Sequence, residues 1–218
     1  GLDIFFVTYN GIHIKTYKKF DGVGFKLFDK KFFENIDRYN KLLMSLQFYR
    51  SFFRYKYMLI VQTDAYIIKG LADLKQLVKK EYDYWGAPWV TGYEVYRFLL
   101  NDYETWLRGF PILKWLLLGK KKEVFVGNGG LSLRRIKKTF FLLLQKRLYV
   151  KNWEGNEDLF FAVHGQKNLC QYKVATVKDA ETFSLEVNMR KKICRGEIPF
   201  GIHGWERYYP NLFEEQSF

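Results

Sequence analysis

Asp64 is the first residue of this sequence whose type and position suggest chemistry. It follows the run Tyr57-Met58-Leu59-Ile60-Val61-Gln62-Thr63, most of which has the apolar character of a buried strand. Ligands of open α/β sheets bind outside the carboxyl ends of the strands. Mg²⁺ or Mn²⁺ commonly binds one or two carboxylates together with substrate phosphates. Asp64 is therefore a candidate metal ligand, and the alternative is an aspartate that caps or turns the chain beside a buried strand.

Two acids, Glu157 and Asp158, stand at the start of a predicted helix that follows Asn156. Negative charge is favourable at a helix N-terminus, and this alone would explain the pair. A carboxylate can also act as a general base that accepts the proton of an attacking hydroxyl. In that interpretation one acid faces the ligand and the other orients it.

A glycine-rich segment, Gly127-Asn128-Gly129-Gly130, lies between two short predicted strands. Glycines permit unusual φ angles and a close approach of the backbone to a ligand. The segment lacks the Gly-Lys-Ser/Thr ending of a phosphate loop and the G-x-G-x-x-G spacing of a dinucleotide site. A ligand-contacting loop and a tight turn between strands both remain open.

His203 lies between glycines in the segment Pro199–Trp205, and the chain has only two other histidines, His13 and His164. Such a histidine can bind a metal through one ring nitrogen. The alternative is a structural histidine that donates a hydrogen bond. His13 and His164 have no comparable surroundings and are expected to be structural or exposed.

The elements that must position these residues alternate between strands and helices, which predicts one α/β domain over residues 1–218. Its first residues already have strand character, which leaves room for missing upstream residues. Residues 91–122 change character and predict an inserted helical hairpin, or an amphipathic surface that rests on a membrane. The expected strands are 2–9, 22–28, 57–66, 83–89 (stopped by Pro88), 124–126, 131–134 and 173–177, and the expected helices are 40–53, 71–81, 135–150 and 156–164.

The composition is that of a folded, strongly basic protein. Hydrophobic residues make up 48% of 218 residues, which excludes a disordered chain, and the net charge of +13 predicts an anionic partner. No apolar run reaches the ~18 residues that span a bilayer, so a soluble or peripheral protein is expected. Cys170 and Cys194 have no metal-type spacing and suggest buried, reduced thiols in a cytoplasmic protein.

Taken in order, four segments resemble the motif pattern of GT-A glycosyltransferases, which has an acidic metal motif, a glycine-rich loop, an x-Glu-Asp motif and a C-terminal histidine. The chain is similar, more closely, to a largely bacterial family that is catalogued as domain of unknown function 5672 and regarded as glycosyltransferase-like. The resemblance extends from about Tyr39 to Trp205 and is carried by 39–43, Gln62-Thr63-Asp64-Ala65, 82–89, 126–134 (VGNGGLSLR), Asn156-Glu157-Asp158 and 199–203.

The resemblance implies a single GT-A-like (Rossmann-like) domain whose central, mainly parallel mixed sheet is flanked by helices. It implies sugar transfer from a nucleotide-diphosphate sugar to a hydroxyl of a glycan or lipid-linked glycan, in bacterial surface polysaccharide synthesis. The expected roles are Asp158 as base with Glu157 as second candidate, Asp64 and His203 as ligands of Mn²⁺ or Mg²⁺, and Gln62, Thr63, Asp64, Gly127, Asn128, Gly129, Gly130, Arg134, Trp85 and Trp89 in donor or acceptor binding.

Several alternatives accompany this interpretation. Gln62 occupies the place of the first acid of the usual metal motif, which favours a catalytically inactive glycan-binding or scaffold domain. Trp85 and Trp89 suit core positions as well as sugar stacking, and Arg134 suits an exposed helix start. The many basic residues also fit a nucleic-acid-binding module, although no such motif accompanies them and no nucleic acid is expected. The same charge would hold the enzyme at the anionic cytoplasmic face of the inner membrane.

Overall fold

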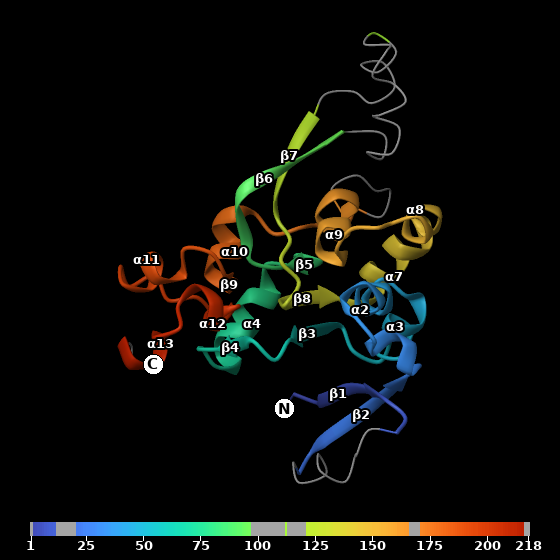
Figure 1. Cartoon of the computed structure of the whole chain (residues 1–218), viewed down its shortest axis with the longest axis horizontal. Coiled ribbons are helices and arrows are strands. Elements are labelled where there is room, and N and C mark those ends of the chain that lie inside the picture. Colours follow the sequence, from blue (N-terminus) through green and yellow to red (C-terminus); the bar gives the residue numbers. More distant parts are fainter. Residues whose placement is uncertain (1, 12–20, 97–111, 113–120, 166–170, 216–218) are drawn as a thin grey trace.

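The computed structural model describes residues 2–11, 21–96, 112, 121–165 and 171–215, and it has the mixed α/β architecture that the sequence predicts (Figure 1). The strands are β1 Ile4–Tyr9, β2 Val23–Phe28, β3 Tyr57–Val61, β4 Ala65–Ile67, β5 Tyr84–Trp85, β6 Pro88–Tyr96, β7 Lys121–Val126, β8 Leu131–Arg135, β9 Ser184–Leu185 and β10 Gly201–His203. The helices are η1 Lys30–Phe33, α2 Ile36–Leu43, α3 Leu46–Arg50, α4 Leu71–Lys79, α7 Ile136–Gln145, α8 Arg147–Lys151, α9 Glu157–Gly165, α10 Val177–Phe183, α11 Met189–Ile193, α12 Trp205–Tyr208 and α13 Leu212–Glu215.

The described strands form several small sheets in place of the expected mainly parallel central sheet. The sheet β3-β8-β5 is antiparallel throughout, and so is the ribbon β6-β7. Among the named strands of the described part, only β1-β2 and β9-β10 pair in parallel. The mainly parallel sheet was an implication of the resemblance, and the strand patterns could not check it, because the period-2 pattern of a strand is the same in either direction. Here the chain turns between β7 and β8 and sends β8 back along β3.

The sheet β4-β10-β9 positions the first candidate residues, because β10 lies between two strands from distant parts of the chain. On one side β10 runs antiparallel to β4, with His203 opposite Ala65. On the other side it runs parallel to β9, with Ile202 opposite Leu185. The register therefore places the end of the β3–β4 connection, Asp64, and the residue after β9, Glu186, on either side of His203.

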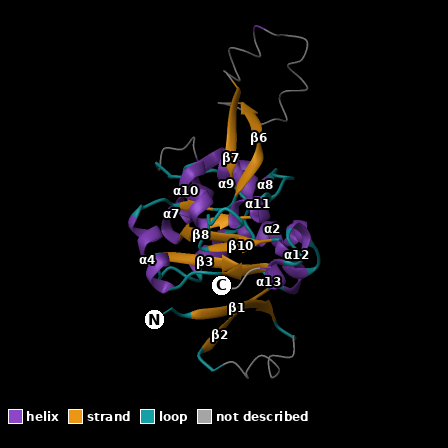
Figure 2. Ribbon diagram, turned by 90° about the vertical axis from the view of Figure 1, so that its left-hand side faces the viewer, coloured by secondary structure: helices purple, strands orange, loops and turns teal. Residues whose placement is uncertain are grey.

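Helices cover the sheets through a core rich in aromatic residues. One cluster joins α2, α3, α7 and α9 to the β1-β2 pair, with Phe5 and Phe52 in edge contact at 5.7 Å between ring centroids. The predicted helix 40–53 is divided into α2 and α3, because the Ser45 hydroxyl accepts a hydrogen bond from the Phe48 amide and starts a new helix. A second cluster packs β3, β5 and β8 against α4 and α10, and Figure 2 shows α4 beside β3.

The ribbon β6-β7 projects from the body of the molecule (Figures 1 and 2). Pro88 is the first residue of β6, a position where its missing amide proton is tolerated, so it begins a strand and does not stop one. Where the sequence predicts a helical insertion over residues 91–122, the described ends at 91–96 and 121–122 are strands. Most of that prediction, 97–111 and 113–120, lies outside the described residues.

Other details differ from the sequence predictions. Residues 173–177 form no named strand and contribute only a bridge between Tyr84 and Val174. Cys194 is exposed, and Cys170 lies outside the described residues. In the described part, no helix combines the length and the apolar character needed to cross a membrane.

Candidate functional site

Asp64 and His203 are adjacent in the structure, although 139 positions separate them in the sequence. The Oδ1 atom of Asp64 lies 3.2 Å from Nε2 of His203. Two hydrogen bonds support the backbone around them: the Gly204 amide donates to the Asp64 carbonyl (3.0 Å), and the Gln62 amide donates to the Gly130 carbonyl (2.9 Å). The pair thus lies at the end of the β3–β4 connection, next to the glycine-rich loop.

The ring of His203 is largely enclosed. Neither ring nitrogen has a well-aligned hydrogen bond to any described residue, although both are shielded from solvent. The Nδ1 atom lies 3.6 Å from Oε1 of Glu186, a residue that no sequence motif marks. Burial raises the pKa of Glu186 above its usual range. Only the parallel pairing of β9 with β10 brings this acid to the site, and such pairing cannot be inferred from the few residues involved.

The glycine-rich loop is buried and contacts every part of the candidate site. A Cβ atom at Gly130 would lie 1.9 Å from Nε2 of His203, and one at Gly129 would lie 2.2 Å from Oε1 of Glu157. The glycines are therefore required for close packing, since none of the three has a positive φ angle. Since neighbouring Cα atoms are about 3.8 Å apart, the Asp64–His203 pair and Glu157 both lie close to one short segment.

Arg134 and Glu157 form a buried ion pair that lies against Gly129, the neighbour of Gly130 in this loop. The Nη2 atom of Arg134 donates to Oε1 of Glu157 at 2.5 Å, and the two side chains are 0% and 5% exposed. Arg134 also donates to the Tyr49 hydroxyl and to Oγ of Ser132, both at 3.0 Å. Arg134 is thus an internal residue and not an exposed residue of a helix start.

Asp158 follows Glu157 in the first turn of α9. Its own amide donates to Oε2 of Glu157 (2.7 Å), so Glu157 is held by Arg134 through one oxygen and by the helix start through the other. Burial, together with the negative charge of Glu157, raises the pKa of Asp158 to about 7. Hydrogen bonds from the amides of Leu159 and Gly129 to the Asp158 carboxylate oppose that shift.

Gln62 and Thr63 have different surroundings. Thr63 is exposed. Burial and the charge of Glu157 raise the pKa of Tyr39, and a hydrogen bond with the Gln62 side chain opposes this change. The Gln62 side chain therefore has a structural partner of its own in Tyr39.

The two candidate tryptophans have opposite environments. Trp85 is fully buried between Tyr82 and Phe183, so it presents no face to a sugar. Trp89 is half-buried, and its ring covers Gly127, where a Cβ atom would lie 1.8 Å away. Trp89 also lines a cavity of about 360 Å³ formed by the β6-β7 ribbon, α10 and α11.

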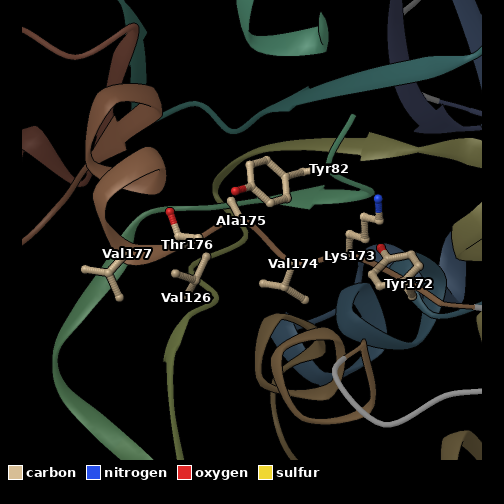
Figure 3. Close-up of a pocket in the computed structure, with 8 residues that line it drawn as sticks. All are labelled: Tyr82, Val126, Tyr172, Lys173, Val174, Ala175, Thr176 and Val177. Atoms are coloured by element: carbon tan, nitrogen blue, oxygen red, sulfur yellow. The ribbon is translucent and has the colours of Figure 1, made fainter. Parts of the chain in front are cut away.

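A larger cavity, of about 470 Å³, lies elsewhere (Figure 3). Its wall is formed by Tyr82, Val126 and the segment from Tyr172 to Val177. It contains none of the candidate catalytic, metal-binding or donor-binding residues, and its lining offers no carboxylate. We therefore assign the candidate site to the Asp64–His203–Glu157–Asp158 region and not to this cavity.

The Asp64–His203 pair fits a divalent cation. Two ligands on neighbouring positions of an octahedral ion, at about 2.1 Å from it, are about 3 Å apart, and the observed separation is 3.2 Å. The enclosed Nε2 atom supplies a nitrogen donor. No group of three His, Cys, Asp or Glu side chains within the described ranges forms a metal site, so these two residues would need ligand or water oxygens to complete the coordination.

Comparison with known proteins identifies the family. The family described as "Protein of unknown function (DUF5672)" matches residues 22–203, which is most of the chain and includes every candidate residue named above. No curated protein and no solved structure matches. The chain therefore belongs to the DUF5672 family of proteins of unknown function.

Proposed function

We propose that this protein is a glycosyltransferase of the GT-A type, which transfers a sugar from a nucleotide-diphosphate sugar to a hydroxyl group of a glycan or lipid-linked glycan acceptor. The order of the four motifs along the sequence is one support for this proposal. The observation that carries it is their spatial convergence. Gly129 packs against Glu157, and the next residue of the same loop, Gly130, packs against His203. The candidate base and the candidate metal ligands thus share one small region.

Asp158 is the proposed general base. In the transfer step, the acceptor oxygen forms a bond to the anomeric carbon while the bond from that carbon to the diphosphate oxygen breaks. The acceptor proton passes to the Asp158 carboxylate, and the leaving diphosphate takes the bonding electron pair. A base with a pKa of about 7 is well matched to this role near neutral pH. This assignment favours inversion at the anomeric carbon.

Glu157 orients the base and does not itself accept the proton in this scheme. Both of its carboxylate oxygens are occupied, one by Arg134 and the other by the Asp158 amide. A carboxylate bound through both oxygens in this way is held in one orientation beside Asp158. Burial and the negative charge of Glu157 together raise the pKa of Asp158.

Asp64 and His203 would hold the divalent cation, Mn²⁺ or Mg²⁺. When bound, the cation would stabilise the negative charge that develops on the leaving diphosphate. Gln62 differs from the acid of the usual motif, so a single carboxylate from this segment contributes to the ion. Binding of the cation is therefore expected to depend strongly on the diphosphate of the donor.

Trp89 is the proposed sugar-stacking residue. It is half-buried, contacts the loop at Gly127 and lines an open cavity, all of which suit a ring that presents one face to a sugar. We place the protein at the cytoplasmic face of the bacterial inner membrane, in surface polysaccharide synthesis. The net charge of +13 suits both the anionic donor and an anionic membrane surface.

The proposal is tested first by ligand binding. Nucleotide sugars are screened by thermal shift with and without Mn²⁺, because a ligand of the folded state raises the apparent stability. The donor found in this way is then used in a transfer assay with Asp158→Asn. We expect this variant to lose transfer by about 10²–10⁴-fold, the usual contribution of a general base, while it still binds the donor.

The matched control is Asp73→Asn, which changes an exposed aspartate in the first turn of α4 and is expected to leave transfer unchanged. Normal turnover by Asp158→Asn would show that the base is misassigned. Donor binding without any transfer or hydrolysis by the wild type would favour an inactive glycan-binding domain. Salt-sensitive binding of random oligonucleotides without donor binding would favour a nucleic-acid-binding protein.

A further inference from the structure

We propose that Glu186 is the positioning residue of the candidate metal pair, and that it orients the His203 ring so that Nε2 faces the cation held by Asp64. This inference rests on the proposed metal site and adds a residue that neither the sequence motifs nor the family match assigns. Histidine ligands in metalloproteins commonly donate their second ring N–H to a carboxylate, which sets the tautomer and the ring orientation. Glu186 is in the place of that carboxylate.

The contacts of Glu186 support this role. Its Oε1 atom lies 3.6 Å from Nδ1 of His203, while Oδ1 of Asp64 lies 3.2 Å from Nε2 on the other side of the ring. A carboxylate oxygen therefore lies near each ring nitrogen of His203. If Nε2 were a ligand of the cation, Nδ1 would carry the ring N–H and direct it toward Glu186.

Asn128 fixes the orientation of Glu186. The Nδ2 atom of Asn128 donates a short hydrogen bond to Oε2 of Glu186, which leaves Oε1 for His203. The other end of the amide, Oδ1, accepts from the Gly130 amide at 3.3 Å, so the Asn128 side chain has a defined orientation. The glycine-rich loop thus connects to the metal pair through Asn128 and Glu186.

The strand register keeps Glu186 in this place. Glu186 is the residue after β9, and β9 pairs in parallel with β10 so that Leu185 is opposite Ile202. The next residues along the two segments, Glu186 and His203, therefore lie beside one another. Leu185 and Ile202 are both buried in the same apolar cluster. The backbone on both sides is therefore anchored, and the position of the carboxylate does not depend on an exposed loop.

Glu186→Gln tests the proposal, because Asn128 Nδ2 and His203 Nδ1–H are both donors. A glutamine offers one acceptor oxygen and must direct its NH₂ group at one of these donors. We expect the affinity for Mn²⁺ to fall by about 10–100-fold, the usual effect of removing such a partner. Glu186→Asp keeps two acceptor oxygens and is expected to lose less affinity than Glu186→Gln.

The measurement uses NMR of the histidine rings, which needs neither donor nor activity. Paramagnetic Mn²⁺ broadens signals close to it, and the chain has only three histidines. A His203→Gln variant assigns the signal. Mn²⁺ is titrated alone and with pyrophosphate, and we expect selective broadening of His203 in the wild type. His164, buried against Phe160 and Trp153, reports that each variant is folded.

Glu181→Gln is the matched control. Glu181 is on α10, and its Oε1 atom lies 2.7 Å from Nζ of Lys192 on α11. This variant is expected to behave as the wild type, whereas Asp64→Ala should abolish the broadening. A Glu186→Gln titration equal to that of the wild type would overturn the role of Glu186 and leave the metal pair intact. Absence of broadening in the wild type, even with pyrophosphate, would overturn both the role of Glu186 and the metal pair. The thermal-shift screen and the transfer assay test donor binding and the Asp158 assignment separately.

Discussion

The ion pair of Arg134 and Glu157 is the most demanding feature of the candidate site. A fully buried guanidinium loses its hydration, and this loss is offset only where partners occupy its donors. Arg134 has three such partners, Glu157, Tyr49 and Ser132, and its guanidinium also lies 5.0 Å from the centre of the Phe161 ring. This arrangement fixes the Glu157 carboxylate next to Asp158.

We expect Arg134→Met to destabilise the protein by about 3–5 kcal/mol, because it removes the cation that is paired with the buried Glu157 carboxylate. Combining it with Glu157→Gln should restore part of that loss, with a coupling free energy of about 0.5–3 kcal/mol. Urea denaturation of the two single variants and the double variant gives the cycle. Additive effects would argue that the two residues are not energetically coupled.

The exposed pair Arg190–Glu215 provides the control for this cycle. Its shortest N–O distance is 3.0 Å, but the Arg190 side chain is 65% exposed. Solvent screens such a pair, so Arg190→Met is expected to cost less than about 1 kcal/mol.

The glycine-rich loop between β7 and β8 organises the site. Its backbone passes so close to His203 and Glu157 that side chains at Gly130 or Gly129 would overlap them. Close packing against His203 and Glu157 thus accounts for the glycines, and contact of the loop with a donor or acceptor stays a prediction. A turn of ordinary residues would separate the acids of α9 from the β4-β10-β9 sheet.

Gly130→Ala is expected to push the His203 ring away from Asp64, because the added Cβ atom would lie 1.9 Å from Nε2. We expect Mn²⁺ affinity to fall at least about 10-fold, with a stability loss of about 1–3 kcal/mol from overpacking. Calorimetric titration with Mn²⁺ and pyrophosphate measures the first effect. Gly70→Ala is the control, since no atom lies within 4 Å of its added Cβ atom. Equal Mn²⁺ binding by the two variants would contradict this account of the loop.

The whole molecule combines a basic composition with an acidic site. The net charge is +13, yet Asp64, Glu157, Asp158 and Glu186 come together with Arg134 as the buried cation among them. An acidic centre suits a divalent cation, and a basic exterior suits an anionic donor or membrane surface. The stability of the fold is therefore expected to depend on the protonation of the buried acids.

The raised pKa of Asp158 determines whether the free energy of unfolding rises or falls with pH. This pKa is about 7 in the folded protein and about 4 in an unfolded chain, so between these values the folded state binds more protons. The free energy of unfolding should therefore fall as the pH rises from about 4 to 7. Three pKa units correspond to on the order of 4 kcal/mol at most. Asp158→Asn removes this contribution, so its stability relative to the wild type should improve over that range.

Urea denaturation of both proteins at pH 4.5, 6 and 8 measures the effect. The comparison isolates Asp158, because the other carboxylates titrate in both proteins. A constant difference between the two proteins across this range would mean that Asp158 titrates normally.

The sequence by itself predicted the mixed α/β class, the family, the strands β1, β2 and β3, and the acids, glycines and histidine that lie together in the fold. These features depend on local patterns and on residue types in a recognisable order. The tertiary structure decided the direction of the strands, the burial of Arg134 and Trp85, and the position of Glu186 beside His203. The physical reason is that strand pairing and burial depend on contacts between distant segments, and an alternating pattern contains neither the direction nor the partner of a strand.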